Sequence, residues 1–290
     1  MRLSNNTSYL GNSFRQNWGR GGFWFSFARS ILFLSLGALL ACSSENERLV
    51  RKAEREALQQ RSQLSKYLYL QVLENHRAKD DIRYRALKGL AEVSISQLFD
   101  YPTAVRAFDT LFEEFGQVNR YQNEIWDLRI KAARIWRLNL QRPERSLDVL
   151  SPLMKSARFS YEFGMELGRT YLNLGDFDQA RHWFVQSWEQ AKRSQNCNVL
   201  KRIQLDLIQV YSLRDRCDEA LQWSHEEFPS NCEPDRFAVS LEQAHCYEIQ
   251  GEVARAKEIY QTVLSDNPQN TRAHFFLESL RYRMREKQRE

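Results

Sequence analysis

The residues of this sequence best suited to chemistry are its cysteines and two histidines near them. Beyond Cys42, four cysteines lie in the second half of the chain: Cys197, Cys217, Cys232 and Cys246. His225 and His245 lie among them, so zinc binding and thiol catalysis are the reactive uses to consider. No two cysteines have the short Cys-x-x-Cys type of spacing of a structural zinc site, and no recognisable motif places a cysteine beside a histidine. The sequence therefore predicts no metal site and no catalytic cysteine.

Other catalytic signatures are also missing from the sequence. It contains no phosphate-binding loop, nucleophile elbow, metal-binding His-x-x-x-His or glycine-rich cofactor turn. Its carboxylates stand mostly beside Lys or Arg, as on helix surfaces. We therefore expect a protein that is not an enzyme and has no cofactor. The alternative is an unrecognised enzyme that acts on cell-wall glycan, and a deep pocket with two close carboxylates would favour it.

Cys42 stands at the end of a distinctive N-terminal segment. Residues 1–41 contain four arginines and no acidic residue, and they end in the run SILFLSLGALLA. This run of 12 residues is shorter than the roughly 20 residues that a membrane-spanning helix needs. A positive segment followed by a short apolar run is typical of a signal peptide.

The end of that run, Leu39-Leu40-Ala41-Cys42, resembles the lipobox of bacterial lipoproteins. The resemblance implies that 1–41 is removed as a signal peptide and that Cys42 receives the lipid, leaving 42–46 as a lipidated tether. The alternatives are a plain anchor helix, or a cleaved signal followed by a coincidental cysteine. Ser43 and Ser44 after the cysteine favour the outer membrane, with the protein facing the periplasm, although the inner membrane stays open.

The chain after Cys42 has a composition typical of a helical protein. Removing four arginines lowers the formal net charge from +5 to +1, which excludes bulk nucleic-acid binding. Only 11 glycines and 6 prolines occur in the whole chain, while leucine and aromatic residues are plentiful. Few turn residues and little alternation of polar and apolar residues favour helices over strands.

Two segments of this chain repeat the same pattern of small and aromatic residues. Residues 161–194 carry Gly168, Tyr171, Gly175, Ala180 and Phe184, and residues 237–270 carry the matching set Ala244, Tyr247, Gly251, Ala256 and Tyr260. The pattern resembles the tetratricopeptide (TPR) repeat, a hairpin of two helices called A and B. Looser copies cover 85–118, 127–160 and 201–234. Each copy has a small residue in helix B, at Ala104, Ser146, Ala180, Ala220 or Ala256.

The resemblance implies an all-α fold, a right-handed TPR-type solenoid of antiparallel helical hairpins with a C-terminal capping helix. We expect N-terminal helices over 47–84 and the solenoid over 85–290, with about five hairpins. Gly175 and Gly251 are expected to end their A helices in a left-handed turn.

In the TPR family, set positions of helix A line a groove that binds partner segments. The resemblance implies that this groove is lined by Lys131, Ile135, Leu138, Met165, Arg169, Leu172, Leu205, Leu213, Leu241, His245 and Ile249. Such a largely apolar groove with a few cations suits an apolar or amphipathic peptide, unless helices of the same chain fill it. Lys131, Arg134 and Arg137 share one helix face, which is either a site for acidic lipids or partners or an ordinary solvated face.

The repeat register also pairs the four cysteines. Cys197 and Cys232 both precede an A helix of consecutive repeats, and Cys217 begins a B helix that runs beside the A helix of Cys246. In an exported chain we therefore expect the disulfides Cys197–Cys232 and Cys217–Cys246.

These features together predict a membrane-tethered scaffold that binds envelope proteins or peptide segments through its groove. Similar lipoproteins include subunits of the β-barrel assembly machine of the BamD type, pilotins and NlpI-type adaptors. An assembly factor for outer-membrane complexes, like BamD or a pilotin, is therefore the nearest alternative. The partner and the oligomeric state are left open by the sequence.

Overall fold

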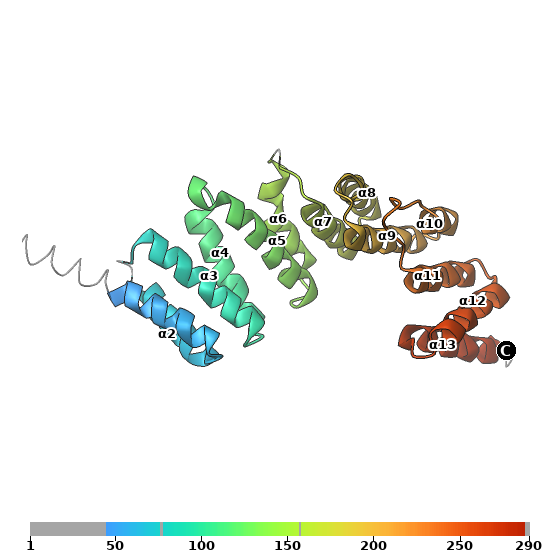
Figure 1. The fold of residues 1–290 in the computed structure, drawn as a ribbon, viewed down its shortest axis with the longest axis horizontal. Coiled ribbons are helices and arrows are strands. Elements are labelled where there is room, and N and C mark those ends of the chain that lie inside the picture. The colour runs from blue at the N-terminus through green and yellow to red at the C-terminus, as the bar shows by residue number, and fades with distance from the viewer. Residues whose placement is uncertain (1–44, 76–77, 157, 288–290) are drawn as a thin grey trace, which may run out of the picture. The chain divides into compact units, whose positions relative to one another are not determined.

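The computed structural model describes residues 45–75, 78–156 and 158–287, and every regular element in these ranges is a helix. The chain divides into two compact units, 1–89 and 90–290, so that the boundary falls within helix α3 (Asp80–Ser96). Figure 1 shows the helices in chain order. This confirms the expected all-α fold of helical hairpins.

The described part of the first unit consists of a helix over 45–58, helix α2 (Ser62–Glu74) and the first part of α3. The first two helices form a hairpin whose close approach is marked by the Ser65 hydroxyl, which donates to the Ala53 carbonyl at 2.8 Å. Gly89 lies against the ring of Tyr69, where a β-carbon would come within 2.4 Å of the ring. A larger residue at this position would therefore separate α2 from α3.

The second unit continues from α3 as a series of antiparallel hairpins and a last helix. Its further helices are α4 (Tyr101–Phe115), the short 3-10 helix η1 (Asn119–Tyr121), α5 (Gln122–Leu138), α6 (Pro143–Met154), α7 (Tyr161–Leu174), α8 (Phe177–Arg193), α9 (Cys197–Ser212), α10 (Cys217–Ser224), α11 (Arg236–Ile249), α12 (Val253–Asp266) and α13 (Thr271–Lys287). The pairs α5/α6, α7/α8, α9/α10 and α11/α12 pack as hairpins, and α13 packs on α12. Each hairpin corresponds to one repeat expected from the sequence.

The small residue of each B helix lies in the core. All five of these residues have no exposed surface: Ala104, Ser146, Ala180, Ala220 and Ala256. In the α7/α8 hairpin, a β-carbon on Gly168 would come within 2.6 Å of the Phe184 ring. The pattern of small residues therefore marks the places where two helices come closest, which is why it survives in the looser repeats.

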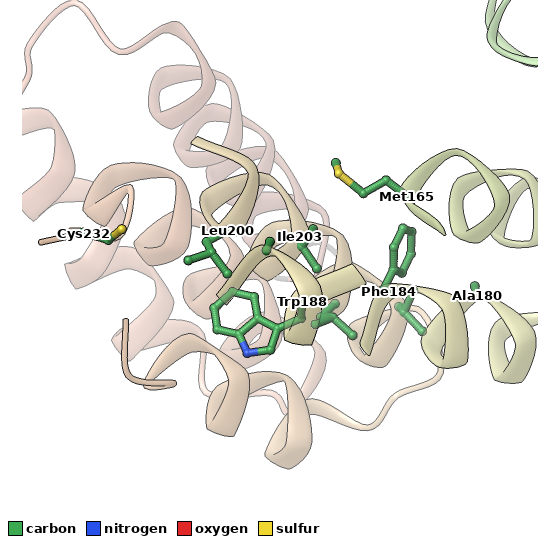
Figure 2. Packing of buried hydrophobic residues seen from close by; sticks show 10 residues of the cluster. Met165, Ala180, Phe184, Trp188, Leu200, Ile203 and Cys232 are labelled. Carbon is green, nitrogen blue, oxygen red and sulfur yellow. The ribbon is translucent and has the colours of Figure 1, made fainter. Parts of the chain in front are cut away.

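One core cluster is built mainly by α7, α8 and α9 (Figure 2). Trp188 and Phe184 of α8 have 1% and 0% of their surface exposed. They pack against Leu200 and Ile203 of α9. Burying an aromatic side chain of this size contributes about 2 to 3 kcal/mol, so this cluster is a main source of stability for the second unit.

The turn inside each hairpin uses one residue with a positive φ angle. Gly175 and Gly251 have φ angles of 79° and 82°, as the sequence predicted. The other hairpins use Phe99, Gln141 and Asp215, with φ angles of 53° to 56°. Gln60, between the helix over 45–58 and α2, has a φ angle of 60° as well. The left-handed turn is therefore common to the described hairpins, although glycine marks it in only two.

Five helices of the second unit begin at a side chain that accepts a hydrogen bond from a backbone N–H three residues later. The capping residues are Asp100, Ser160, Asp176, Asn196 and Asp235. Such caps stabilise a helix by about 1 kcal/mol each. Among the described helices, none has the length and the apolar character that a membrane span requires.

Candidate functional site

The A helices α5, α7, α9 and α11 contact one another in sequence order, α5 with α7, α7 with α9 and α9 with α11. Together they form the layer on which the expected groove residues lie. The structure therefore brings these residues onto one series of helices. It does not make all of them available to a partner.

Three of the expected groove residues are buried in the core. Ile135, Met165 and Leu241 have 4%, 6% and 2% of their surface exposed. Met165 belongs to the cluster of α7, α8 and α9 in Figure 2. The expectation that these three line an open groove is wrong, because the packing of adjacent A helices covers the positions that the family pattern leaves open.

Two further groove residues, Leu172 and Leu205, are half-buried and pack against the core clusters of their own repeats. Four others are exposed: Lys131, Leu138, Leu213 and Ile249. Leu138 and Leu213 have more than half of their surface exposed, at 55% and 53%. The exposed apolar residues are spread over three helices, so the layer does not present the continuous apolar groove that the sequence suggested.

His245 and Ile249 do lie together, in a depression of about 240 Å³ between α11 and α13. The other lining residues are Glu248, Val253, Leu280, Arg283 and Met284. Arg283 is ion-paired with Glu248, which also accepts a hydrogen bond from the Tyr260 hydroxyl at 2.7 Å. The charged groups of this depression therefore already have partners within the chain.

The centre of the A-helix layer is occupied by an ion-pair network of Arg134, Arg137, Glu166, Arg169 and Asp206. Glu166 of α7 is fully buried and accepts from the Arg137 Nε at 2.7 Å, while Arg137 itself is only 6% exposed. The Arg134 Nε donates to the other carboxylate oxygen of Glu166 at 3.2 Å. Arg134 keeps 53% of its side chain exposed and is thus the solvent-facing member of this group.

The network continues from α7 to α9. Arg169 holds Asp206 through two nitrogens, with the Nη2 and Nε atoms 2.7 Å and 3.0 Å from the Oδ2 oxygen. The Asp206 side chain is only 13% exposed. Burial raises the pKa of Asp206, and the charges of Arg169 and Arg137 oppose this rise. Since Arg137 and Glu166 both act on Asp206, the charges of three helices form one electrostatic unit.

This network was not predicted from the sequence, although the sequence contains part of its signal. Arg134 and Arg137 on α5, and Glu166 and Arg169 on α7, each stand three residues apart and so share a helix face. The missing information was that these faces meet. The sequence predicted an exposed cationic face of Lys131, Arg134 and Arg137. This prediction is wrong for Arg137, because its side chain is buried and paired with Glu166.

The network contains three cations and two carboxylates, so it leaves one positive charge in excess. Arg134 and the exposed Lys131 carry cationic groups at the solvent side of α5. We call the surface formed by these two residues the α5 cationic surface. Its chemistry favours a polar, acidic partner segment over the apolar peptide expected from the sequence.

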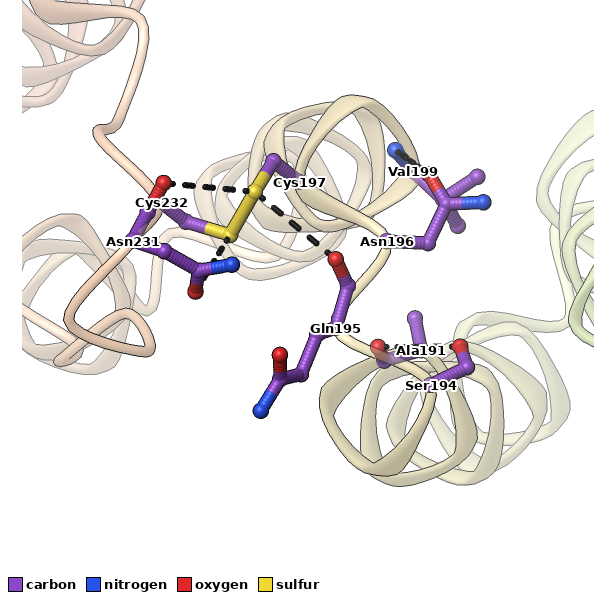
Figure 3. The surroundings of a disulfide bond; sticks show 8 residues. All are labelled: Ala191, Ser194, Gln195, Asn196, Cys197, Val199, Asn231 and Cys232. Atoms are coloured by element: carbon purple, nitrogen blue, oxygen red, sulfur yellow. Dashed lines mark hydrogen bonds between the residues drawn. A yellow bond between two sulfur atoms is a disulfide. The ribbon is translucent and has the colours of Figure 1, made fainter.

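The first predicted disulfide is present. Cys197 at the start of α9 is bonded to Cys232, with a Cα–Cα distance of 5.2 Å (Figure 3). The neighbouring Asn196 caps α9 by accepting from the Val199 N–H. The bond therefore ties the start of one A helix to the loop before the next, which confirms the register argument for this pair.

The second predicted disulfide is not formed in the structure, where Cys217 and Cys246 are free and buried. Both lie in one buried core cluster, so the predicted proximity of α10 and α11 at this point is right. Burial raises the pKa of both thiols, which keeps them protonated and unreactive at neutral pH. The remaining predicted site residue, Cys42, lies outside the described residues.

Two observations bear on enzymatic chemistry. A second depression, of about 340 Å³ between α11 and α12, contains the carboxylates of Glu258 and Asp266. Eight residues of one helix separate them, or about 12 Å along its axis, which is wider than the carboxylate pair of a glycoside hydrolase. Within the ranges that the structure describes, no group of three His, Cys, Asp or Glu side chains is arranged to hold a metal ion.

No protein-family model and no curated protein matches the sequence of this chain. A tetratricopeptide repeat protein from Parabacteroides merdae is similar in structure, with 13% identity and a TM-score of 0.48, over 87% of this chain and 96% of that one. The pilF protein of Pseudomonas aeruginosa has 11% identity and a TM-score of 0.49, over 82% of this chain and 99% of that one. Likenesses at this level assign neither a partner nor an activity to the chain.

Proposed function

We propose that this protein is a scaffold, tethered by lipid at Cys42 to the bacterial outer membrane, which holds an acidic segment of an envelope protein on its α5 cationic surface. The observation that carries the proposal is the half-exposed Arg134. It is anchored through Glu166 to a buried network and still presents its guanidinium to solvent.

An arginine held in this way is suited to recognise a carboxylate. The guanidinium offers five N–H donors, and the ion pair with Glu166 uses its Nε. Because Glu166 restrains the side chain, less conformational entropy is lost when a partner binds than for a free surface arginine. Lys131, one helical turn before Arg134, adds a second cation that attracts an acidic segment.

The tether gives the scaffold its mechanism. A protein held at a membrane surface raises the local concentration of the partner it binds, without any chemical step. The N-terminal charge pattern, the apolar run and the sequence Leu39-Leu40-Ala41-Cys42 support this tether. Replacing Cys42 with Ala is expected to release the protein from the membrane fraction, and undiminished membrane association would contradict the lipid anchor.

A pull-down from detergent-solubilised envelopes tests the binding surface. The chain with Lys131→Glu and Arg134→Glu is compared with the wild type, and captured proteins are identified by mass spectrometry. We expect a partner that is captured by the wild type and lost with the variant, and whose capture weakens as salt is raised.

The matched control carries Arg181→Glu and Arg193→Glu, two exposed positions on the B helix α8. It has the same change in net charge but leaves the α5 cationic surface intact. A partner captured equally by all three proteins would contradict the proposed surface. Capture lost in the control as well would show that net charge alone is responsible.

A further inference from the structure

The first described helix, residues 45–58, contains equal numbers of acidic and basic residues. The acids are Glu45, Glu47, Glu54 and Glu56, and the bases are Arg48, Arg51, Lys52 and Arg55. From the sequence this helix is electrically balanced, with no charged face to distinguish. The structure separates the two signs.

The acidic side chains form ion pairs with arginines of the neighbouring helix or turn in the first unit. Arg85 of α3 is ion-paired with both Glu47 and Glu54, at N–O distances of 3.0 Å and 2.9 Å. Arg61, in the turn before α2, is ion-paired with Glu56 at 3.2 Å. Three of the four carboxylates of the helix are therefore held in ion pairs by these two arginines.

The four bases lie on the opposite, exposed side of the helix. Arg48, Arg51, Lys52 and Arg55 are spaced at i, i+3, i+4 and i+7, and all four are exposed. We call these four residues the cationic row. Val50 and Ala53, on the other side of the helix, have no exposed surface.

Most of the charge of the row is available to an outside partner. Arg51 is ion-paired with Glu47 at 2.7 Å, although its own side chain is 70% exposed. In the part of the chain that the structure describes, no carboxylate forms an ion pair with Arg48, Lys52 or Arg55. One turn beyond the row, Leu58 has 86% of its surface exposed. This leucine adds one exposed apolar side chain beside the bases.

The position of the row in the chain limits how far it can be from the membrane, provided that Cys42 carries the lipid as proposed above. Arg48 follows Cys42 by only six residues. Even fully extended, six residues span about 20 Å, so the row begins close to the headgroups. A tether of this reach lets the helix come within about 8 Å of the headgroups, the Debye length at physiological salt, where their charges act on the row.

We propose that the cationic row docks on the anionic phospholipid headgroups of the membrane that holds the lipid, and so orients the first unit on that membrane. Each cation near an anionic surface increases binding about fivefold. The three cations without an ion pair would together contribute roughly a hundredfold preference for anionic over neutral lipid at low salt. The lipid anchors the chain, while the row determines which face of the first unit is turned to the bilayer.

The test uses the mature lipidated protein, purified in detergent and reconstituted into vesicles of phosphatidylcholine, with or without phosphatidylglycerol. Gln59→Cys, exposed at the end of the helix, is labelled with an environment-sensitive dye. The label is selective because Cys197 and Cys232 are bonded and the other two cysteines of the second unit are buried. Protein without Gln59→Cys measures any background labelling, including that of an unacylated Cys42.

The readout is quenching of the dye by phospholipids with brominated acyl chains. We expect stronger quenching with phosphatidylglycerol than without it, reversed by salt. Arg48→Gln, Arg51→Gln, Lys52→Gln and Arg55→Gln together should abolish the difference. Glutamine has nearly the helix propensity of arginine and lysine, so the helix is retained, which circular dichroism verifies.

The control with the same change in net charge replaces four exposed arginines of the second unit with glutamine, at Arg181, Arg193, Arg202 and Arg281. It should keep the wild-type quenching. Equal quenching in both kinds of vesicle, or a difference that survives removal of the row, would overturn the proposal and favour an acidic protein as the partner of the row.

Flotation of the same samples separates this inference from the lipid anchor. Protein that fails to float with phosphatidylcholine vesicles has no effective anchor, and the proposed tether is then wrong. In that case salt-sensitive flotation with phosphatidylglycerol, lost when the row is replaced, still supports the row. Failure to float with either kind of vesicle would overturn both.

Discussion

The buried ion pair between Arg137 and Glu166 allows a sharp test of the charge network. Replacing Glu166 with Leu leaves Arg137, which is only 6% exposed, without its carboxylate. Removing one partner of a buried pair costs about 3 to 5 kcal/mol, because the other charge stays buried without compensation. We therefore expect Glu166→Leu to lower the free energy of unfolding by about 4 kcal/mol.

The reverse replacement, Arg137→Met, should cost less. Glu166 would keep its ion pair with Arg134 at 3.2 Å, and Arg134 is half-exposed and can adjust its position. We expect a loss of about 2 kcal/mol for this variant, below the range for a fully orphaned charge. The double variant should recover much of the loss, because methionine and leucine pack together where two charges had to be desolvated.

Urea unfolding of the three variants, followed by circular dichroism, measures these free energies and gives the coupling energy of the pair. The control is Asp148→Asn, which removes the exposed pair of Asp148 with Arg145, whose side chains are 65% and 51% exposed. Such a pair contributes less than about 0.5 kcal/mol. A loss below about 1 kcal/mol for Glu166→Leu, or a double variant equal to the sum of the single ones, would refute the reasoning.

Three other replacements test separate features of the fold. Burial raises the pKa of Asp206, so the stability that this residue contributes is full at low pH and is lost as pH rises from about 4 through the raised pKa of the folded state. Asp206→Asn should remove this decrease of the free energy of unfolding with pH in urea titrations at several pH values, and an unchanged pH dependence would contradict the raised pKa. Gly175→Ala should lower the free energy of unfolding by about 1 kcal/mol in the same assay. The only cause is backbone strain at the φ angle of 79°, because no atom lies within 4 Å of an added β-carbon, and an unchanged stability would contradict this strain. Cys197→Ser removes the disulfide between residues 35 positions apart and should lower the free energy of unfolding by about 3 kcal/mol. Equal stability of the wild-type protein with and without reductant would contradict a stabilising disulfide.

The helix contacts within a hairpin and the glycine turns were predictable because residues close together in the sequence determine them. The small residues such as Ala180 and Ala256 mark helix contacts within one hairpin, and Gly175 marks a turn that needs a positive φ angle. The disulfide between Cys197 and Cys232 followed from the repeat length, because equivalent positions of adjacent repeats lie side by side.

The turns at Phe99 and Gln141 escaped prediction because these residue types do not favour a positive φ angle, and Asp215 tolerates it without marking it as glycine does. The same contrast applies to Cys217 and Cys246, whose proximity followed from the register while the structure leaves them unbonded.

The charged surfaces were decided by tertiary structure. From the sequence, Arg137 belongs to a cationic helix face. In the structure it is paired with Glu166, which lies 29 residues later in the chain. From the sequence, the positive and negative charges of the helix over 45–58 are equal in number. In the structure, Arg85 forms ion pairs with two of its carboxylates, while the basic side chains stay exposed. A sequence determines which charges each helix carries, but only the neighbouring helix determines which are neutralised, because ion pairs form over a few ångströms of space and are independent of separation along the chain.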